Sequence, residues 1–454
     1  MLETNGDPRV DASTLVVLAF SATAGVLVEF YDFFIYGYAA ASAFPAIFFP
    51  RLPAAQALVF SYLAFGAGFP ARLLGAFLFG HFGDRSGRKF AFLVNIGIVG
   101  LTTCVTGLVP SYATLGITAP ILLVLLRVIQ GIGLGGEFGG ASALLAEFAA
   151  TRRSRAFWIS LANLGIPLGG ISASAVLLLL NKSFATTGWR VAMLLSAIIV
   201  VPALLARYQL ADTPMFERLK EREAVAKLPS FSVFKSHASP IVLIALVCAF
   251  QQMDGYVSGT YVISFMKLAG IPLGTTATLL VIARIADIAG VVLSGPGADV
   301  LKRKKAAFIA IALTTALSFP FVLSILGKHL VRIAIFQCLL TFFGIGVLHG
   351  LAPILAAESF PTKYRYSGTG ISYSMSAMFG GMIAPPVLTL FVGTDPAGKW
   401  FYVPIVYTIY GAIAILALLF LRETRDLILE ELDTTMRPGV TQRPHDARET
   451  PMRL

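Results

Sequence analysis

The sequence is poor in charged residues, and this scarcity excludes a soluble protein of its size. Charged side chains make up 13% of the 454 residues, whereas hydrophobic ones make up 57%. A soluble globular chain usually carries roughly a quarter charged residues, which it needs to cover its surface. The composition therefore indicates a protein that crosses a membrane several times.

Cysteine is also scarce, and no residue pattern for redox, metal or nucleotide chemistry is present. Cys104, Cys248 and Cys338 lie singly inside apolar stretches, so the sequence predicts neither disulfides nor a zinc site. It lacks the Gly-rich loop ending in Gly-Lys-Ser/Thr that an ATP-driven pump needs, and it lacks His-Glu-x-x-His. We therefore expect no catalytic residues, no enzyme activity, no cofactor and no metal.

The formal net charge of +11 does not indicate binding to nucleic acid. The Lys and Arg residues are spread over short loops between apolar stretches and form no basic domain that could hold a duplex. A lipid bilayer, a small-molecule substrate and a proton are the partners we expect.

Apolar stretches of about 20 residues are long enough to cross a bilayer as helices. Such stretches are separated by charged residues or by Pro and Gly, and twelve of them emerge. They span approximately 14–40, 55–81, 90–109, 114–145, 156–181, 190–209, 239–266, 271–296, 306–327, 331–357, 366–392 and 400–421. The fold class we predict is an all-α integral membrane protein with twelve transmembrane helices.

Basic residues are distributed unevenly over the predicted loops. The middle loop and the loops after even-numbered spans carry 18 Lys and Arg residues, against 7 on the other side. Because basic loops stay in the cytoplasm, both termini are predicted to be cytoplasmic, in a multi-pass protein of the bacterial inner membrane.

The chain also divides into segments. We predict a six-helix half over 1–209, a cytoplasmic linker over 210–238 and a second six-helix half over 239–421. The remainder, 422–454, is predicted to be a cytoplasmic tail with few apolar residues.

The two halves carry similar short patterns in the same order. Asp32 and Gly37 recur as Asp254 and Gly259, and four further pairs recur at offsets between 211 and 215 residues. These further pairs are Ala71-Arg72 with Ala283-Arg284, Gly80-x3-Asp84 with Gly295-x3-Asp299, Glu147-x3-Thr151 with Glu358-x3-Thr362, and Asp212-Thr213 with Glu423-Thr424. Such a repeat predicts two pseudo-symmetric bundles around a central cavity, with alternating access by rocking of the halves.

Charged residues inside predicted spans locate this cavity, because ionised side chains are costly in a bilayer and rarely face lipid. We assign substrate or proton binding to Glu29, Asp32, Arg72, Arg127, Glu137, Asp254 and Arg284. Asp32 and Arg127 are predicted to lie at similar depth. They form either a static ion pair between helices or a proton site whose proton affinity is set by burial beside a guanidinium.

Arg72 and Arg284 occupy equivalent positions in the repeat. A guanidinium offers a planar fork of donors that fits a carboxylate, so the two arginines suit an organic anion. The alternative is a structural role, with each arginine bound to a backbone carbonyl or to a nearby acid, Glu29 and Asp287 respectively.

A further charged cluster is predicted at the cytoplasmic ends of the helices. Asp84, Arg88, Glu147 and Arg153, with Asp299 as the repeat equivalent of Asp84, are the gating residues we predict. They would latch the inner face while the cavity is open to the outside.

Several of these stretches resemble a known family. They are EFYDFFIYG, RLLGAFLFGHFGDRSGRK, LRVIQGIGLGGEFGGASALLAEFA, GWRVAMLLSA, DTPMF and AESFPTKYRYSGTGISYS. Together they resemble the metabolite:proton symporter family of the major facilitator superfamily over nearly the whole chain. The resemblance implies a proton symporter and assigns family positions to Asp32, Arg72, Arg127 and Glu137. Members carry organic acids such as oxoglutarate, citrate and shikimate, or zwitterions such as proline and betaine.

Some positions depart from the family pattern. Leu73 stands where the family usually has Pro, Asp212 stands where Glu is common, and Lys302 replaces the glycine found at position 87 in the first half. We expect these changes to alter gating and helix bending more than the type of transport.

The sequence thus predicts a monomeric secondary active transporter that takes up a small organic anion together with a proton. Three alternatives stay open: proton-coupled transport of a zwitterionic osmolyte, a passive facilitator of the same fold, and a receptor that binds without transport. No motif distinguishes among the possible substrates.

Overall fold

The protein consists of helices throughout the part of the chain that its computed structural model describes. The described residues are 12–86, 88–135, 145, 155–208, 233–234 and 236–425, and every regular element in them is helical. The all-α fold class is confirmed. The predicted linker (210–238) and tail (422–454) lie largely outside the described residues.

The helices before residue 209 form the first half of the bundle. They are α1 (Ala12–Ser42), α2 (Phe44–Phe48), α3 (Ala54–Gly66), α4 (Gly68–Ser86), α5 (Arg88–Leu108), α6 (Tyr112–Leu115), α7 (Thr118–Leu134), α9 (Arg155–Leu161), the 3₁₀ turn η1 (Ala162–Leu164), α10 (Gly165–Leu179), the π-helical η2 (Phe184–Gly188), α11 (Trp189–Leu194) and α12 (Ser196–Tyr208).

The helices after residue 235 form the second half. They are α15 (Ala238–Tyr256), η3 (Val257–Tyr261), α16 (Val262–Leu268), α17 (Leu273–Leu301), α18 (Arg303–Leu326), α19 (Leu330–Leu340), η4 (Thr341–Val347), α20 (Leu348–Ala357), α21 (Thr362–Ala377), η5 (Met378–Met382), α22 (Ala384–Val392) and α23 (Tyr402–Phe420). The segments η3, η4 and η5 are π-helical and interrupt long spans of this half.

Eleven of the twelve predicted spans each coincide with one helix or with a run of consecutive helices among the described residues. Nine described stretches are long and apolar enough to cross a membrane, and two shorter apolar helices cover 93–108 and 118–134. The fourth predicted span, 114–145, is described as a continuous helix only as far as Leu134.

The distribution of side chains is that of a membrane protein. Large apolar side chains face outward, including Leu179 (81% exposed) and Val300 (77% exposed), whereas most of the charged side chains predicted inside the spans are buried. This arrangement is expected where lipid surrounds the protein and charges must be kept from it.

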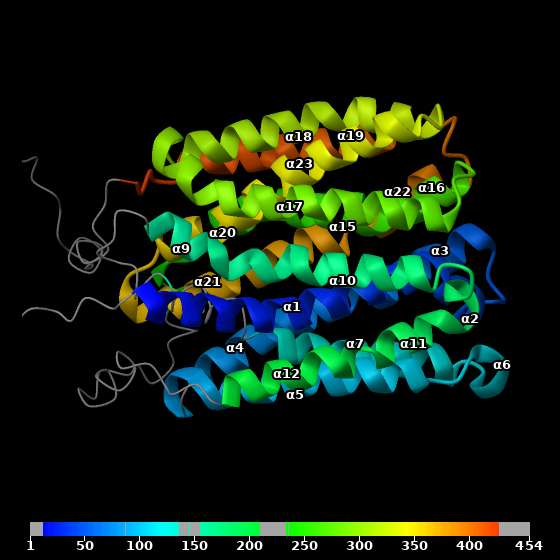
Figure 1. Ribbon diagram of the computed structural model, residues 1–454, viewed down its shortest axis with the longest axis horizontal. Helices are drawn as coiled ribbons and strands as arrows, with labels where there is room; N and C mark the ends of the chain where they lie inside the picture. Colours follow the sequence, from blue (N-terminus) through cyan, green and yellow to red (C-terminus); the bar gives the residue numbers. More distant parts are fainter. Residues whose placement is uncertain are drawn as a thin grey trace, which may run out of the picture.

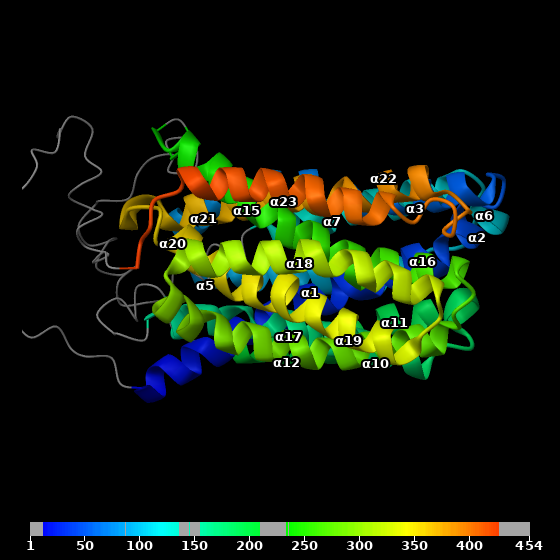
Figure 2. The ribbon, with the colours of Figure 1, turned by 90° about the horizontal axis from the view of Figure 1, so that it is seen from above.

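Figure 1 shows the helices running along the long axis, with the first half mostly below and the second mostly above. Figure 2 gives the same bundle after a quarter turn. In both views the start of α1 and the chain after α23 lie at one end, here called the termini end. We call the contact between the two halves the seam, along which α10 packs on α17, α4 on α21 and α3 on α22.

Close approach of α4 and α7 brings together the helices that carry two of the predicted site arginines in the first half. A Cβ atom on Gly131 of α7 would collide with the backbone of Gly68 in α4. Small residues at such a crossing let helix backbones touch, as is common in membranes. Arg72 and Arg127 therefore project from two helices that are in backbone contact.

Candidate functional site: buried ion pairs along the seam

Asp32 of α1 is held by polar side chains from α5 and α7. Gln130 donates a hydrogen bond of 2.7 Å to Oδ2 of Asp32, and the Thr103 hydroxyl donates to Oδ1. Arg127 Nη1 lies 3.3 Å from the same Oδ2. The predicted proximity of Asp32 and Arg127 is confirmed, and all four side chains are buried.

Arg127 is enclosed by aromatic rings. Its guanidinium carbon lies 4.5 Å from the ring centre of Phe33, 4.4 Å from that of Tyr36 and 4.9 Å from that of Phe65. Its Nε donates a 3.1 Å hydrogen bond to the Phe65 carbonyl, while Nη2 has no hydrogen-bond partner within the described ranges. Arg127 thus has one donor left for a further anion.

Arg72 of α4 forms an ion pair with Glu29 of α1 through Nη1 and Oε1. Its guanidinium carbon also lies 5.3 Å from the ring centre of Tyr373, which belongs to α21 in the other half. Its Nε is buried without a hydrogen-bond partner. Arg72 therefore lies at the seam and can still donate to an acceptor.

Arg284 of α17 occupies the corresponding place on the other side of the seam. Nη1 lies 3.0 Å from Oδ2 of Asp287, three residues later on the same helix. The guanidinium carbon lies 4.1 Å from the ring centre of Phe34, which belongs to α1 in the first half. A Cβ on Gly259 would lie 2.6 Å from Nη2, so this glycine leaves the room that Arg284 occupies.

Aromatic rings fill the middle of the seam between these arginines. Tyr256 of α15 packs against Phe33, Phe65 and Phe69, with ring centres 5.2 to 6.1 Å apart. Phe30 packs edge-on against His349 of α20 at 5.9 Å. Rings from both halves thus close the middle of the seam.

Asp254 of α15 points into its own half of the bundle. Tyr407 of α23 donates a 2.6 Å hydrogen bond to Oδ1, and Oδ2 has no hydrogen-bond partner. No cation among the described residues lies within ion-pair distance of Asp254. Asp254 is therefore the repeat equivalent of Asp32 in position but not in its partners.

A cluster of charges closes the termini end of the seam. Arg155, at the start of α9, contacts Glu358 of the other half through Nη2 at 2.7 Å. Glu358 also lies 3.3 Å from Arg303 and accepts a hydrogen bond from Thr424. Asp299 contacts Arg303 at 2.7 Å within the second half.

The opposite end of the seam is closed by neutral groups. The Tyr62 hydroxyl of α3 and the Ser264 hydroxyl of α16 are 2.8 Å apart, and Ser264 donates to the Ala41 carbonyl at 3.2 Å. Contacts between the halves are thus present toward both ends of the seam, and the charged side chains between them are buried.

The remaining predicted site residues cannot be placed. Glu137, Glu147 and Arg153 lie outside the described residues, and so do the side chains of Asp84 and Arg88. The latch predicted from them stays a prediction. Of that set only the side chain of Asp299 is described, and its ion pair with Arg303 lies within one half.

Sequence reasoning missed the pairing of Arg155 with Glu358 across the seam. Arg303 and Glu358 are the repeat equivalents of Arg88 and Glu147. The repeat therefore indicated that these two second-half residues belong to a charged cluster at the helix ends. Thr103, which donates to Asp32, carried no signal, because a threonine in an apolar stretch commonly bonds its own helix.

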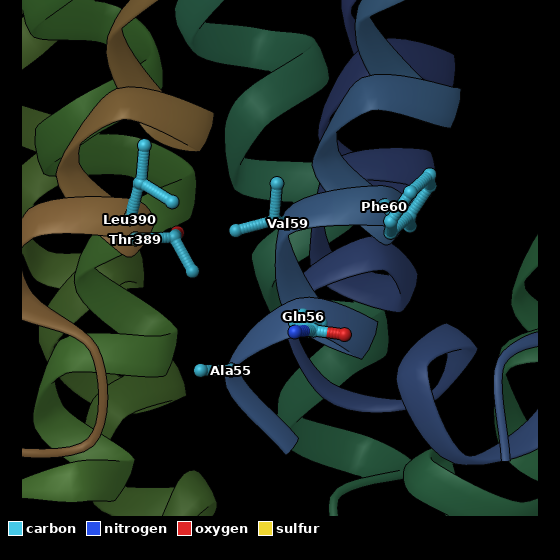
Figure 3. A pocket seen from close by; sticks show the side chains of 6 residues that line it. All are labelled: Ala55, Gln56, Val59, Phe60, Thr389 and Leu390. Atoms are coloured by element: carbon cyan, nitrogen blue, oxygen red, sulfur yellow. The ribbon is translucent and has the colours of Figure 1, made fainter. Parts of the chain in front are cut away.

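The groove in Figure 3 is a separate feature. It lies between α3 and α22 and is lined by Ala55, Gln56, Val59, Phe60, Thr389 and Leu390. Phe60 and Leu390 are largely exposed, and no lining residue belongs to the buried ion pairs. The groove is an apolar surface feature and not the site described above.

Comparisons with known proteins agree with this architecture. The model of the Major Facilitator Superfamily matches residues 23–385. The inner membrane metabolite transport protein YhjE of Escherichia coli is 34% identical, over 88% of this chain and 92% of its own length. The shikimate transporter of Escherichia coli is 29% identical, over 87% and 91% respectively.

Another relative and a solved structure extend the comparison. The ectoine/proline transporter ProP of Corynebacterium glutamicum is 30% identical, over 88% of this chain and 82% of its own length. A crystal structure of D-xylose-proton symporter shares the fold, with a TM-score of 0.69 at 18% identity over 90% of this chain and 98% of its own. The chain is thus a multi-pass membrane transporter and not an enzyme, and it belongs to the Major Facilitator Superfamily, among that superfamily's metabolite transporters.

Proposed function

We propose that the protein takes up a small organic anion together with a proton by alternating access across the seam. The observation that carries this proposal is the placement of Arg72 and Arg284. The two arginines are repeat equivalents, both are buried at the seam, and each stacks on a ring of the opposite half. Two guanidinium groups facing one interface suit a carboxylate-bearing substrate.

Asp32 is the proton site in this proposal, and Arg127 is the cation that controls it. Burial favours the neutral carboxylic acid, whereas an approaching guanidinium favours the carboxylate. When a substrate anion competes for Arg127, Asp32 takes up a proton; when Arg127 returns to Asp32, the proton leaves. The proton is the coupling ion, and the cycle needs no cofactor.

The termini end is the cytoplasmic side in this proposal, in a bacterial inner membrane. The two six-helix halves, 1–209 and 239–421, rock as units about the seam, and a single chain is sufficient. Arg155 and Glu358 hold the cytoplasmic side closed, and Tyr62 and Ser264 hold the outer side closed. The predicted latch of Asp84, Arg88, Glu147 and Arg153 would act beside Arg155.

A zwitterion is the second candidate substrate. Each arginine has an acid beside it, Glu29 for Arg72 and Asp287 for Arg284. A substrate with a carboxylate and a cationic nitrogen would satisfy both members of such a pair. The names of the relatives, which include a shikimate transporter and an ectoine/proline transporter, are compatible with either class.

The first experiment is a thermal-shift screen of the purified protein against shikimate, citrate, oxoglutarate, proline and glycine betaine. We expect an organic acid to raise the melting temperature most, because bound ligand stabilises the folded state. Energised cells given that acid should then make their medium more alkaline. Uptake without alkalinisation would replace symport by facilitated diffusion.

A further inference from the structure

Asp254 differs from the other buried acids at mid-span because it lacks a cation. Glu29, Asp32 and Asp287 each form an ion pair with an arginine. Asp254 is fully buried, yet it takes part in none of the ion pairs seen among the described residues. The three mid-span ion pairs thus match each arginine with one acid, and Asp254 is the acid left without a cation in them.

The hydrogen bonds around Asp254 support the same protonation state. An ionised carboxylate needs donors on both oxygens when it is buried, because each unsatisfied lone pair is costly. Tyr407 supplies one donor to Oδ1, and no group in the described part of the chain donates to Oδ2. The carboxylic acid form, which carries its own proton on one oxygen, matches this single donor.

The remaining neighbours of Asp254 bring little positive charge. The nearby charged groups are Arg284 and Asp287 of α17, which oppose each other and are bound together at 3.0 Å. Ser258 of η3, whose hydroxyl donates to the backbone carbonyl of Asp254, lies beside it together with Thr314 of α18 and Gly344 of η4. A side chain at Gly344 would collide with Oδ2 of Asp254. Arg284 is thus the one cation among these described neighbours, and it forms an ion pair with Asp287.

The backbone next to Asp254 is irregular on both sides of the contact. The π-helical η3 begins three residues after Asp254, and Gly344 lies within the π-helical η4. Isolated π-helical turns inside longer helices occur frequently at functional sites. The corresponding α1, which carries Asp32, is a regular helix throughout its described length.

We propose that Asp254 is a second proton-binding site and that each transport cycle moves two protons, one on Asp32 and one on Asp254. The Asp254 carboxylate takes up its proton from the outer side when the seam opens there. It keeps this proton through the closed arrangement and releases it to the inner side once the substrate anion has left Arg284 there, because the unpaired guanidinium is then a cation near neutral Asp254. This inference rests on the proposed symport for its second part, whereas proton binding itself is independent of it.

Proton binding can be tested without a substrate, by infrared difference spectroscopy of the reconstituted protein between mildly acidic and alkaline buffers. We expect a carboxylic-acid C=O stretching band that Asp254→Asn removes and that Asp32→Asn leaves in place. A band retained in full by Asp254→Asn, or no such band in the unmodified protein, would overturn the assignment of a proton to Asp254.

A second variant covers the case in which Asp254→Asn does not fold. Tyr407→Phe keeps the acid and removes its one hydrogen-bond donor, which makes the carboxylate harder to form. The same band should persist to more alkaline buffer in Tyr407→Phe than in the unmodified protein. An unchanged titration of that band would contradict its assignment to Asp254.

The stoichiometry is tested in proteoliposomes with radiolabelled shikimate, citrate, proline and glycine betaine as probes, at zero membrane potential and a pH gradient of one unit. Under these conditions, co-transport of two protons supports about 100-fold accumulation of a probe, and co-transport of one proton supports about 10-fold accumulation. We expect Asp254→Asn to fall from the first value to the second. If the unmodified protein reached only the one-proton value, the proton on Asp254 would not be a transported one. If no probe accumulated, the result would count against the proposed function itself.

Discussion

Asp32 and Asp254 hold equivalent positions in the two halves of the repeat, but the halves surround them differently. Arg127 lies within ion-pair distance of Asp32, whereas Asp254 has the neutral Tyr407 as its partner. The repeat therefore places an acid at the same position in each half, and the neighbours that differ between the halves determine whether that acid is charged.

The two seam arginines differ in a related way. Arg72 pairs with Glu29 on another helix, so sliding of α1 past α4 changes this pair. Arg284 pairs with Asp287 three residues away on its own helix, and this pair survives any rigid movement of α17. At mid-span the ion pairs of the first half thus depend on helix position, whereas the Arg284–Asp287 pair of the second half does not.

The largest effect we predict comes from removing the charge in the first half. Asp32→Asn mimics the protonated acid at nearly constant volume, so the protein should still bind substrate and exchange it across the membrane. It should not accumulate substrate against a gradient, because no proton then exchanges with substrate at Arg127 and the proton on Asp254 alone does not couple the cycle. Accumulation and counterflow in proteoliposomes with an imposed pH gradient measure the two properties separately.

The matched control for this prediction is Asp254→Asn, which we expect to retain reduced accumulation. Equal loss in both variants would break the distinction between the two acids. Full accumulation by Asp32→Asn would move the first proton site elsewhere, and Glu29, Glu137 and Asp254 would be the next carboxylates to test.

The second prediction compares the two arginines. Arg72→Ala should raise the apparent KM for the anion by roughly 10- to 100-fold, since a hydrogen bond to a charged group contributes about 1.5 to 3 kcal/mol. Arg72→Lys should be less harmful because lysine keeps the charge but loses the planar fork. Initial uptake rates over a range of substrate concentrations give these values.

The same substitutions at Arg284 sharpen the comparison. Because Asp287 competes for Arg284 on its own helix, we expect Arg284→Ala to raise KM less than Arg72→Ala does. A substrate carried equally well by all four variants would contradict anion recognition at the seam and favour a neutral compound.

The sequence predicted the fold well because membrane spans have a strong signal. Each predicted range between 14 and 421 contains a helix, since about 20 apolar residues are needed to cross a bilayer and charges or Pro/Gly breaks separate them. The closeness of Asp32 and Arg127 could also be predicted, because unpaired charges are too costly inside a membrane.

The partners of the site residues were harder to predict, since they depend on how helices rotate about their axes. The sequence placed Asp254 and Asp32 alike, and nothing in it showed that Tyr407 would face Asp254. Sequence also gave Arg155 no partner across the seam, because Glu358 lies more than 200 residues away in another bundle. Hydropathy reports which segments span the membrane but not which faces meet.

The third prediction concerns the ionic contact between the halves at the termini end. Arg155→Ala removes the charge that ties the first half to Glu358, although Arg303 still neutralises Glu358. We expect the termini end to open more often. A reporter cysteine at Ser160, which is fully buried here, should then react faster with a small maleimide after the three native cysteines have been replaced.

Asp299→Asn is the matched control, because it removes an ion pair that lies within the second half. It should leave labelling at Ser160 nearly unchanged. If Asp299→Asn increased labelling as much as Arg155→Ala, contact between the halves would not be what holds this end closed, and the predicted gating role of Asp299 would gain support.

The smallest effect is expected at the opposite end, where the halves are joined by neutral groups. Tyr62→Phe removes the hydroxyl that contacts Ser264 and keeps the ring that packs near Tyr261. A neutral hydrogen bond contributes about 1 kcal/mol, so opening at this end should become about 5-fold more frequent. The control is Tyr31→Phe, which removes a hydrogen bond to the Ala192 carbonyl within one half. Labelling of a cysteine at Ser61, buried beside this contact, should rise with Tyr62→Phe and not with Tyr31→Phe; a rise as large as that caused by Arg155→Ala at the termini end would show that the ionic and neutral closures are equally strong.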